Sequence, residues 1–359
     1  VLMVDFSCAL KLAMPLAVLS AMREAGRAHI TVKGGKFLEA VAEADTIVFD
    51  KTGTLTKATP TVKEVVTFGL GNEDELLRIA ACLEEHFPHS MAKAVVDAAK
   101  KKGLDHEEMH SKVNYIVAHG ISSYIEEKKV IIGSYHFVFD DEKCQVRPEY
   151  REKFDGLPEE YSHLYLAVDQ ELAAVICIED PLREEAADIV RELREAGIEN
   201  VVMMTGDSER TAAAIARKVG IEEYYSEVLP EEKAGFIEKE KAAGRKVIMI
   251  GDGINDSPAL SAANVGIAIS DGAEIAREVA DITIMASDLH EIVTLRYLSR
   301  SLMKRIHTNY HSIIGINAAL ILLGVGGLIQ PTTSALLHNM STLAISLKSM
   351  KNLIEEEKL

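Results

Sequence analysis

The most extended pattern in the chain is an apolar run near its C-terminus. From Ile306 to Leu347, 42 residues pass without one Asp, Glu, Lys or Arg. A membrane-spanning helix needs about 20 apolar residues, so this run has room for two. Its break near the middle, Gln330-Pro331-Thr332-Thr333, suits a tight turn. We therefore expect a transmembrane helical hairpin over residues 301–351 and a short tail over 352–359. A buried hairpin of a soluble protein is the alternative.

A second apolar segment opens the chain. Residues 1–23 carry no charge before Arg23 except at Asp5 and Lys11, and we expect a further transmembrane helix there. Charged residues inside membrane helices are costly and usually serve a function. Pro15 would free a backbone carbonyl and unwind or kink the helix, which is a common way to build an ion site. Basic residues flank the apolar segments, so by the positive-inside rule the chain between them lies in the cytoplasm.

Between these segments, short apolar runs alternate with helical patterns. Thr46–Phe49, Val201–Met204 and Val247–Ile250 each lead into a polar turn and then a helix. The buried strands of a parallel α/β sheet have this pattern. We therefore predict an α/β fold, with one domain made from residues 24–57 and 175–300.

The stretch over residues 58–174 has a different pattern. It holds two helices within Glu73–Lys102 and short strands with hairpin-like spacing, such as Ile121–Glu126 and Val130–Gly133. This order of elements predicts an α+β domain inserted between the two parts of the α/β domain.

Composition agrees with this segregation of apolar and polar segments. Lys plus Arg total 39 and Asp plus Glu total 56, for a formal charge of −17, yet 48% of residues are hydrophobic. The acidic balance argues against a nucleic-acid partner, which would require a basic face. The four cysteines lie far apart without a CxxC pair, so we expect no disulfide scaffold and a reducing cytosolic environment for most of the chain.

Residues that can transfer a phosphoryl group follow the predicted strands. Asp50-Lys51-Thr52-Gly53-Thr54-Leu55-Thr56 comes directly after the first strand. At the carboxyl end of a strand, a carboxylate faces the crevice where α/β folds bind ligands, so Asp50 can attack a phosphoryl group and form an aspartyl-phosphate. Thr205-Gly206-Asp207 ends the second strand, and its hydroxyl and backbone N–H groups can hold the transferring oxygens.

A magnesium site and a lysine complete this constellation. Gly251 to Pro258 (GDGINDSP) ends the third strand, and its Asp252, Asn255 and Asp256 offer oxygen ligands that suit Mg²⁺ bound jointly with phosphate. Lys233, in Leu229-Pro230-Glu231-Glu232-Lys233, can reach the same phosphoryl oxygens. Each element alone could be a turn or a solvated side chain, but the four in order predict a phosphoryl-transfer site.

The motifs DKTGTLT (50–56), TGD (205–207) and GDGINDSP (251–258) resemble those of P-type ATPases, in the haloacid-dehalogenase superfamily. The resemblance covers essentially the whole chain, which is similar to the C-terminal half of such a pump. It implies a Rossmannoid haloacid-dehalogenase-like phosphorylation domain, an inserted nucleotide-binding domain and transmembrane helices. It also implies that ATP phosphorylates Asp50, and that Asp50, Asp252 and the carbonyl of Thr52 hold Mg²⁺.

The resemblance implies roles for further residues. Thr205, Gly206, Asp207 and Lys233 would bind the phosphoryl group and the nucleotide. Asn255 and Asp256 would support the site. Asp180 and Arg183, in Asp180-Pro181-Leu182-Arg183, match a hinge-side element near the nucleotide. Phosphatases of the superfamily carry a second Asp two residues after the nucleophile, where this chain has Thr52. Since a threonine cannot activate water at neutral pH, we expect the phosphoenzyme to persist.

In the insert, Leu83 to Ala94 (LEEHFPHSMAKA) resembles the SEHPLAKA motif of heavy-metal pumps. Matching the Ala-Lys-Ala end implies that His89 binds adenine with Glu84 as its partner, and His86 is a competing candidate. Gly120 of Ala118-His119-Gly120 and Gly133 of Gly133-Ser134 match the Gly-x-Gly and Gly-Asn elements of the family in part.

The apolar helices carry candidates for a metal site. Asp5 to Pro15 (DFSCALKLAMP) resembles the Cys-Pro-Cys helix of heavy-metal pumps with one cysteine kept, and His338-Asn339-Met340-Ser341-Thr342 resembles an HNxSS-type motif. The implied ligands of the transported ion are Cys8, Ser7, His338 and Asn339. One thiolate, one imidazole and oxygen donors favour Zn²⁺, Cd²⁺, Mn²⁺, Co²⁺ or Fe²⁺ over Cu(I). A membrane cysteine that is merely a small apolar residue is the alternative.

These features predict an ATP-driven exporter of a divalent metal ion, in the lipid bilayer of a bacterial cell membrane. No Thr-Gly-Glu motif of an actuator domain occurs, and the first residue is Val1 rather than Met. We expect a fragment that needs a missing actuator and N-terminal membrane segment to complete transport. The competing hypotheses are a membrane-anchored phosphatase of the same superfamily and a nucleotide-sensing partner of another membrane protein.

Overall fold

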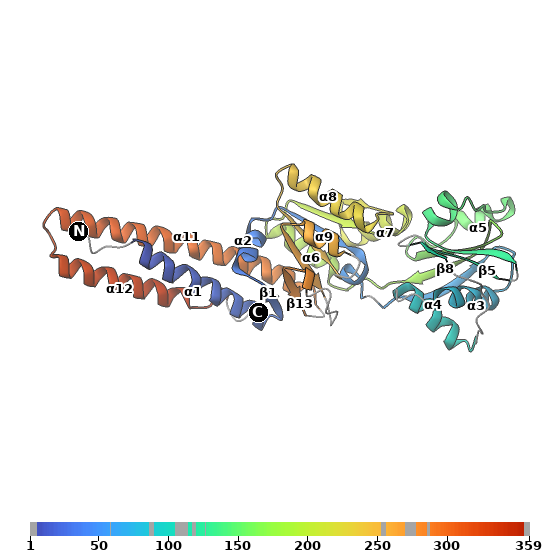
Figure 1. The fold of residues 1–359 in the computed structure, drawn as a ribbon, viewed down its shortest axis with the longest axis horizontal. Helices are drawn as coiled ribbons and strands as arrows, with labels where there is room; N and C mark the ends of the chain where they lie inside the picture. The colour runs from blue at the N-terminus through green and yellow to red at the C-terminus, as the bar shows by residue number, and fades with distance from the viewer. Residues whose placement is uncertain are drawn as a thin grey trace.

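The protein is elongated and has three parts in a row (Figure 1). The computed structural model describes residues 6–57, 59–85, 90–104, 114–116, 120–125, 127–252, 256–269, 278–285 and 288–354. A helical arm consists of α1 (Phe6–Arg27), the outer part of α11 (His290–Val325) and α12 (Pro331–Ser349). The arm projects from a central α/β domain, and a distal domain with its own sheet lies at the opposite end.

The central domain is built on a seven-stranded sheet in the order β1-β13-β12-β11-β2-β9-β10. The pair β1 and β13 is antiparallel and the other pairs are parallel. The three strands predicted from apolar runs are confirmed as β2, β9 and β11. Every residue of β2 and β11 is buried, which explains why residues 47–49 and 247–250 are continuously apolar. The strands are β1 (Ile30–Val32), β2 (Thr46–Asp50), β9 (Asn200–Met204), β10 (Glu223–Tyr225), β11 (Val247–Gly251), β12 (Val265–Ile269) and β13 (Ile282–Ile284).

Helices cover both faces of this sheet, because alternate residues of its strands point to opposite sides. Ile47 and Phe49 of β2 pack on one face, together with α2 (Gly35–Glu43), α6 (Ala186–Glu195), α7 (Glu209–Val219) and the first turns of α11. Val48 packs on the other face, against α8 (Pro230–Ala242) and α9 (Ser257–Ala262). The result is a three-layer α/β domain with β2 near the centre of the sheet.

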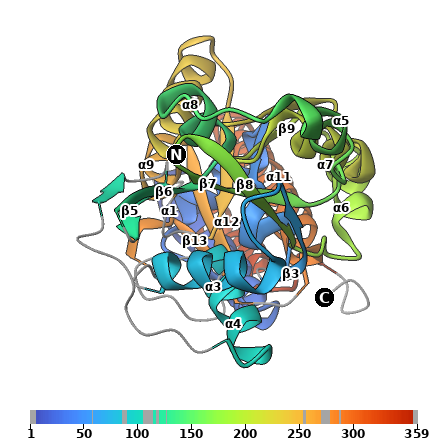
Figure 2. The ribbon, with the colours of Figure 1, turned by 90° about the vertical axis from the view of Figure 1, so that its right-hand side faces the viewer.

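The distal domain is an antiparallel six-stranded sheet in the order β3-β8-β7-β6-β5-β4. Helices α3 and α4 pack on one face, and α5 lies over the other, where an aromatic cluster includes Phe68, Phe154 and Tyr165 (Figure 2). These elements are β3 (Thr61–Thr67), α3 (Glu73–Glu84), α4 (Ser90–Lys101), β4 (Asn114–Ile116), β5 (Gly120–Ile125), β6 (Lys128–Gly133), α5 (Arg151–Asp155), β7 (Ser162–Val168) and β8 (Glu171–Glu179), with short helical turns at His136–Asp141 and Pro148–Tyr150.

The expected division between residues 174 and 175 falls inside β8. This strand pairs with both β3 and β7 up to residues 178 and 179, and its residues 172–178 are buried on both faces. The distal sheet therefore continues to Glu179, and the chain returns to the central domain just after it.

α11 joins the arm to the central domain. It begins at His290 rather than near residue 301, because its first turns bury Ile292, Leu295 and Leu298 against the central sheet. Arg296, also buried, donates hydrogen bonds to the carbonyls of Val41 and Ala196 at the ends of α2 and α6. α11 thus forms a continuous rod from the core of the central domain to the tip of the arm.

The hairpin turn lies at residues 326–330, slightly before the expected Gln330–Thr333. Gly327 has a φ of +72°, which glycine adopts at little cost, and Pro331 is the first residue of α12, where a missing N–H is harmless. α1 is a continuous helix through Pro15. It packs on α11 and α12 through alanines at every fourth position, which permit close helix packing: Ala9, Ala13, Ala17, Ala21 and Ala25.

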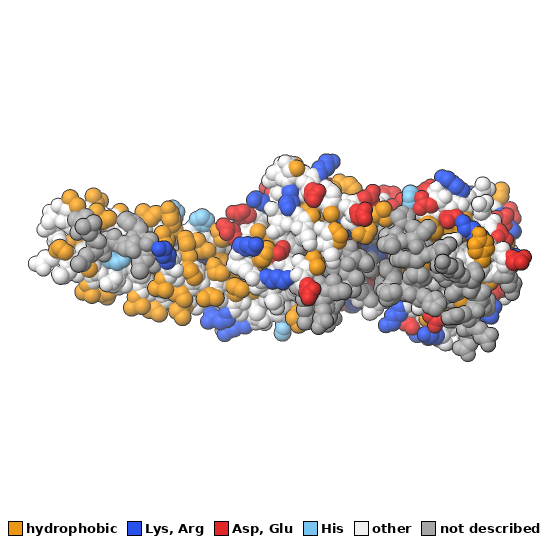
Figure 3. All heavy atoms as spheres, viewed as in Figure 1, with side chains coloured by type: hydrophobic (Ala, Val, Ile, Leu, Met, Phe, Trp, Pro, Cys, Tyr) orange, Lys and Arg blue, Asp and Glu red, His pale blue; other side chains and the backbone are white. Residues whose placement is uncertain are grey.

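The surface of the arm is apolar, whereas charged side chains cover the other two parts (Figure 3). Leu322, Leu328 and Leu343 are 72%, 74% and 61% exposed. Among helices in the described part of the chain, α11 is the one long and apolar enough to cross a membrane by length and composition.

Candidate functional site

The expected catalytic residues meet at one edge of the central sheet. β2 lies between β9 and β11, and all three run in the same direction. Asp50 ends β2, Thr205 follows β9 and Asp252 follows β11. Because the chain leaves β2 to one side for β9 and returns on the other side with β11, this edge is a topological switch point, where α/β folds bind ligands.

Lys233 bridges two buried carboxylates at this edge. Its Nζ lies 2.5 Å from Oδ1 of Asp50 and 2.8 Å from Oδ1 of Asp256. Lys233 is in the first turns of α8, so the helix directs its side chain into the crevice. Glycine at position 251 lets Asp256 fold back here, since a Cβ would stand 2.5 Å from its Oδ2. The sequence thus predicted these three residues as one cluster, and the structure brings them together.

The charges in this cluster change one another's protonation. Burial raises the pKa of Asp50 to about 6, although Lys233 acts in the opposite direction. Burial also raises the pKa of Asp256. For Lys233, burial alone would lower the pKa, but the two carboxylates more than offset it, so its pKa lies above the usual value. Lys233 therefore keeps its charge beside Asp50, whose pKa is about 6.

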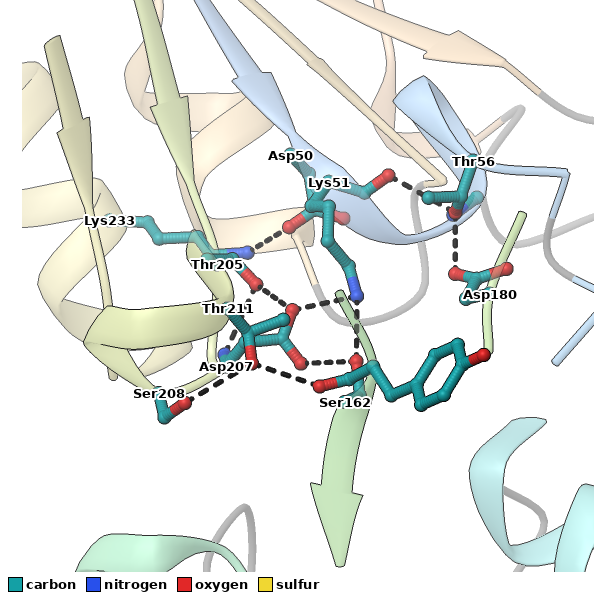
Figure 4. A network of polar contacts seen from close by, with 12 residues as sticks. Asp50, Lys51, Thr56, Ser162, Asp180, Thr205, Asp207, Ser208, Thr211 and Lys233 are labelled. Atoms are coloured by element: carbon teal, nitrogen blue, oxygen red, sulfur yellow. Dashed lines mark hydrogen bonds and ion pairs between the residues drawn. The ribbon is translucent and has the colours of Figure 1, made fainter. Parts of the chain in front are cut away.

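A second ion pair lies beside the first (Figure 4). Nζ of Lys51 is 2.7 Å from Oδ2 of Asp207, and the hydroxyl of Thr205 donates to the same carboxylate at 2.7 Å. Ser162 of the distal domain donates to Oδ1 of Asp207, also at 2.7 Å. Sequence reasoning missed Lys51, although it follows Asp50 directly, and Ser162, which no motif marked.

The loop after Asp50 is held by the strand that returns from the distal domain. The hydroxyl of Thr56 donates to Asp180 at 2.6 Å and accepts from the N–H of Gly53 at 3.0 Å, while Arg183 donates to the carbonyl of Thr56 at 3.2 Å. Thr52 lies in this loop, with backbone angles that are not helical. Asp180 and Arg183 thus position the loop that carries Thr52.

The oxygen donors of the crevice fit a divalent cation. Asp50 and Asp256 bring two carboxylates against Lys233, and the charge of Asp252 adds to the rise in the pKa of Asp256. A hard cation such as Mg²⁺ would neutralise this excess of negative charge. Among the residues that the structure describes, no three His, Cys, Asp or Glu side chains already form a metal cluster. Asn255 lies outside the described residues.

The nucleotide candidates lie in the distal domain. Glu84, at the end of α3, is 8% exposed, and burial raises its pKa to about 7. Gly120 and Gly133 are opposite each other on β5 and β6. A Cβ on Gly120 would come 2.3 Å from the Phe137 ring, so packing alone requires glycine there. His89 lies outside the described residues, as does His86.

The arm contains a buried polar pair. Nδ1 of His338 on α12 lies 2.9 Å from Oδ1 of Asn317 on α11, and both side chains are buried. In the described part of the chain, Nδ2 of Asn317 has no hydrogen-bond partner. Asn339 is exposed and does not join this pair. The side chains of Ser7 and Cys8 lie outside the description. Sequence reasoning missed Asn317, whose signal was an amide in the part of α11 that has no charged residue, 306–325.

Comparisons with known proteins identify the family of this chain. Residues 44–264 match the model of the haloacid dehalogenase-like hydrolase family. A zinc-exporting P-type ATPase of Mycobacterium marinum is 35% identical over 98% of this chain, and a manganese-exporting P-type ATPase of Mycobacterium tuberculosis is 36% identical over 98%. The chain spans about half the length of these relatives, 48% and 49%.

Two solved structures of heavy-metal ATPases also align with this chain. The crystal structure of a zinc-transporting PIB-type ATPase in the E2.Pi state aligns with 97% of this chain and 56% of its own, at 28% identity and a TM-score of 0.69. The catalytic domain of the CPx-ATPase CopB-B aligns with 77% of this chain and 98% of its own, at 29% identity and a TM-score of 0.62.

Proposed function

Because the chain belongs to the haloacid dehalogenase-like hydrolase family, and within it to the heavy-metal P-type ATPases, we propose that it is the catalytic half of an ATP-driven exporter of a divalent metal ion. Phosphorylation occurs on Asp50. One observation carries this proposal: the Asp50 carboxylate is 7% exposed at the end of the central strand and lies 2.5 Å from the Lys233 ammonium.

In the proposed reaction, an Oδ of Asp50 attacks the γ-phosphorus of ATP. The bond from that phosphorus to the β,γ-bridging oxygen breaks, and ADP leaves with the electron pair. Lys233 neutralises the charge around the reacting oxygens, and the hydroxyl of Thr205 and the N–H of Gly206 hold the phosphoryl group. Bound Mg²⁺, held by Asp50, Asp252 and the Thr52 carbonyl, would supply further charge neutralisation.

The product is expected to persist in this chain. Hydrolysis requires a group that activates water, and position 52 carries a threonine hydroxyl, which is not basic at neutral pH. In the proposed pump, that step needs an actuator domain supplied by a further part of the protein. Glu84, His89, Gly120 and Gly133 are proposed to hold the adenine in the distal domain.

The arm is proposed to cross the membrane with α1, α11 and α12, in a multi-pass arrangement with both α/β domains in the cytoplasm. Its exposed leucines suit lipid contact. The transported ion is proposed to bind Nε2 of His338 and Oδ1 of Asn317, with Cys8 and Ser7 as further ligands. Asn339, which is exposed and apart from this pair, is not among them. Since Nδ1 of His338 faces an amide oxygen at 2.9 Å, an Nδ1–H donor leaves Nε2 free to bind a metal. Zn²⁺ or Mn²⁺ suits this donor set better than Cu(I).

The test of phosphorylation uses Mg²⁺ and [γ-³²P]ATP. Wild-type protein should take up acid-stable, hydroxylamine-labile label that persists for minutes, and Asp50→Asn should take up none. Asp188→Asn, an exposed carboxylate on α6, serves as the control and should label like wild type. Equal labelling of Asp50→Asn would overturn the proposal. Steady release of phosphate without stable label would favour a phosphatase instead, and ATP binding without label would favour a nucleotide sensor.

A further inference from the structure

A cluster of contacts joins the distal domain to the segment that follows β9. Arg210 at the start of α7 donates to Oε1 of Glu159 at 2.9 Å and to the carbonyl of Asp155 at 2.8 Å. The hydroxyl of Thr211 donates to the carbonyl of Tyr161 at 3.0 Å. Next along the chain, Ser162 donates to Asp207 at 2.7 Å. The start of β7 is therefore docked against the central domain.

The Ser162 contact differs from the others because it ends on the charges beside Asp50. Ser162 is 4% exposed, and its hydroxyl also accepts a hydrogen bond from Nζ of Lys51 at 3.3 Å. Lys51 is the residue after the nucleophile. Figure 4 shows the hydroxyl between the Lys51 ammonium and the Asp207 carboxylate, with Thr205 on the far side of Asp207. A side chain of the distal domain is thus a member of the catalytic hydrogen-bond network.

These groups depend on one another electrostatically. Burial would raise the pKa of Asp207, but Lys51 and the hydroxyls of Ser162 and Thr205 more than offset it, so the pKa of Asp207 is lowered. A charged Asp207 in turn holds the Lys51 ammonium by an ion pair. Removing one hydroxyl would leave a buried carboxylate short of one donor, which disturbs the geometry of both charges.

We propose that Ser162 is a positioning residue for phosphoryl transfer, which acts through Lys51 and Asp207. Its hydroxyl reaches them when the distal domain is docked on the central domain, and it then holds the ammonium of Lys51 and the Thr205–Asp207 loop beside Asp50. This inference rests on the proposed function. It makes the acceptor site complete only when the distal domain is docked on the central domain, which links the domain arrangement to reactivity.

The test compares Ser162→Ala, Ser162→Thr and Thr211→Val. Thr211→Val also loses one interdomain hydrogen bond, but one that ends on a backbone carbonyl rather than on catalytic charges, so it is the matched control. Ser162→Ala should slow phosphoenzyme formation at saturating ATP by about tenfold, the loss typical of one hydrogen bond to a charged group. ATP affinity should stay within about twofold, since the hydroxyl contacts protein charges in the docked domains. Ser162→Thr, which keeps a hydroxyl, should recover most of the rate.

The outcomes separate this inference from the proposed function. If wild type takes up no label, both fail. If wild type labels and Ser162→Ala labels at the same rate, the inference alone fails. Equal slowing in Ser162→Ala and Thr211→Val would also overturn it, because simple docking would then explain the effect. A change in ATP affinity without a change in rate would assign Ser162 to nucleotide binding and contradict positioning.

Discussion

In the central domain, the buried charges lie within hydrogen-bond distance of one another, whereas the buried pair in the outer part of the arm, His338 and Asn317, is joined by a hydrogen bond rather than an ion pair. Lys233 lies between Asp50 and Asp256, and Lys51 is paired with Asp207. In the arm, His338 is paired with Asn317, whose amide nitrogen lacks a partner in the described part of the chain. Both regions are buried, but they satisfy their polar groups in different ways.

This difference follows from what each region must do. The crevice keeps several charges at fixed positions, so each charge needs a counter-charge from the same chain. In the arm, Nε2 of His338 and the second lone pair of Oδ1 of Asn317 are the atoms that the proposed ion would bind. Removing one charged side chain from the crevice should therefore lower the free energy of unfolding. Removing one polar side chain of the His338–Asn317 pair should lower the response to metal ions.

The largest effect is expected for Lys233→Met. It leaves the Asp50 and Asp256 carboxylates buried without their cation, and breaking a buried ion pair from one side costs about 3–5 kcal/mol. The free energy of unfolding of the central domain, measured by urea titration, should fall by about that amount. Phosphoenzyme formation should fall by at least ~100-fold. Lys239→Met, exposed on the same helix, is the control. If both variants unfold at the same urea concentration, the crevice does not depend on charge pairing.

The sequence predicted most of the residues that line this crevice, but it did not predict the contact between the crevice and the distal domain. Asp50, Thr205 and Asp252 follow apolar strands, and the ends of parallel strands meet at one sheet edge, so a local pattern was sufficient. The Ser162 contact depends on how two domains dock, and no pattern around Ser162 encodes that. The end of the distal sheet was misplaced because β8 is apolar throughout, as are the strands of the central sheet.

A smaller effect, of a different kind, is expected in the arm. Asn317→Leu and Asn309→Leu change two buried amides on α11, but Asn309 donates to Ser349 at 2.8 Å, whereas Oδ1 of Asn317 lies 2.9 Å from Nδ1 of His338, the proposed ion ligand. In protein joined to the proposed actuator domain, Asn317→Leu should lower metal-stimulated ATPase activity by about tenfold, and the loss of its hydrogen bond to His338 should lower stability by about 1 kcal/mol. Asn309→Leu should lower stability by about 1 kcal/mol and keep the metal response. Loss of the metal response in Asn309→Leu but not in Asn317→Leu would contradict the assignment of Asn317 to the ion.

The smallest expected effect is a shift in the pH dependence of phosphoenzyme formation. It tests whether the charge of Asp256 raises the pKa of Asp50. Attack requires the Asp50 carboxylate, whose pKa is about 6. The rate of phosphoenzyme formation at low ATP, which reports the free protein, should therefore fall as the pH drops through about 6. Asp256 raises the pKa of Asp50 by repulsion, so Asp256→Asn should move this midpoint to lower pH, whatever it does to the maximum rate.

The free energy of unfolding should fall as the pH rises towards about 6, whereas the rate of phosphoenzyme formation rises. The pKa of Asp50 is higher in the folded protein than its ordinary value of 3.8, so the folded state binds the proton more tightly than the unfolded state. The contribution of this carboxyl to stability is therefore greatest below pH 3.8 and is lost as the pH rises to about 6. Unfolding measured beside the rate should show this slope in wild type and a weaker one in Asp50→Asn. An identical slope in both proteins would mean that Asp50 is not the group that titrates.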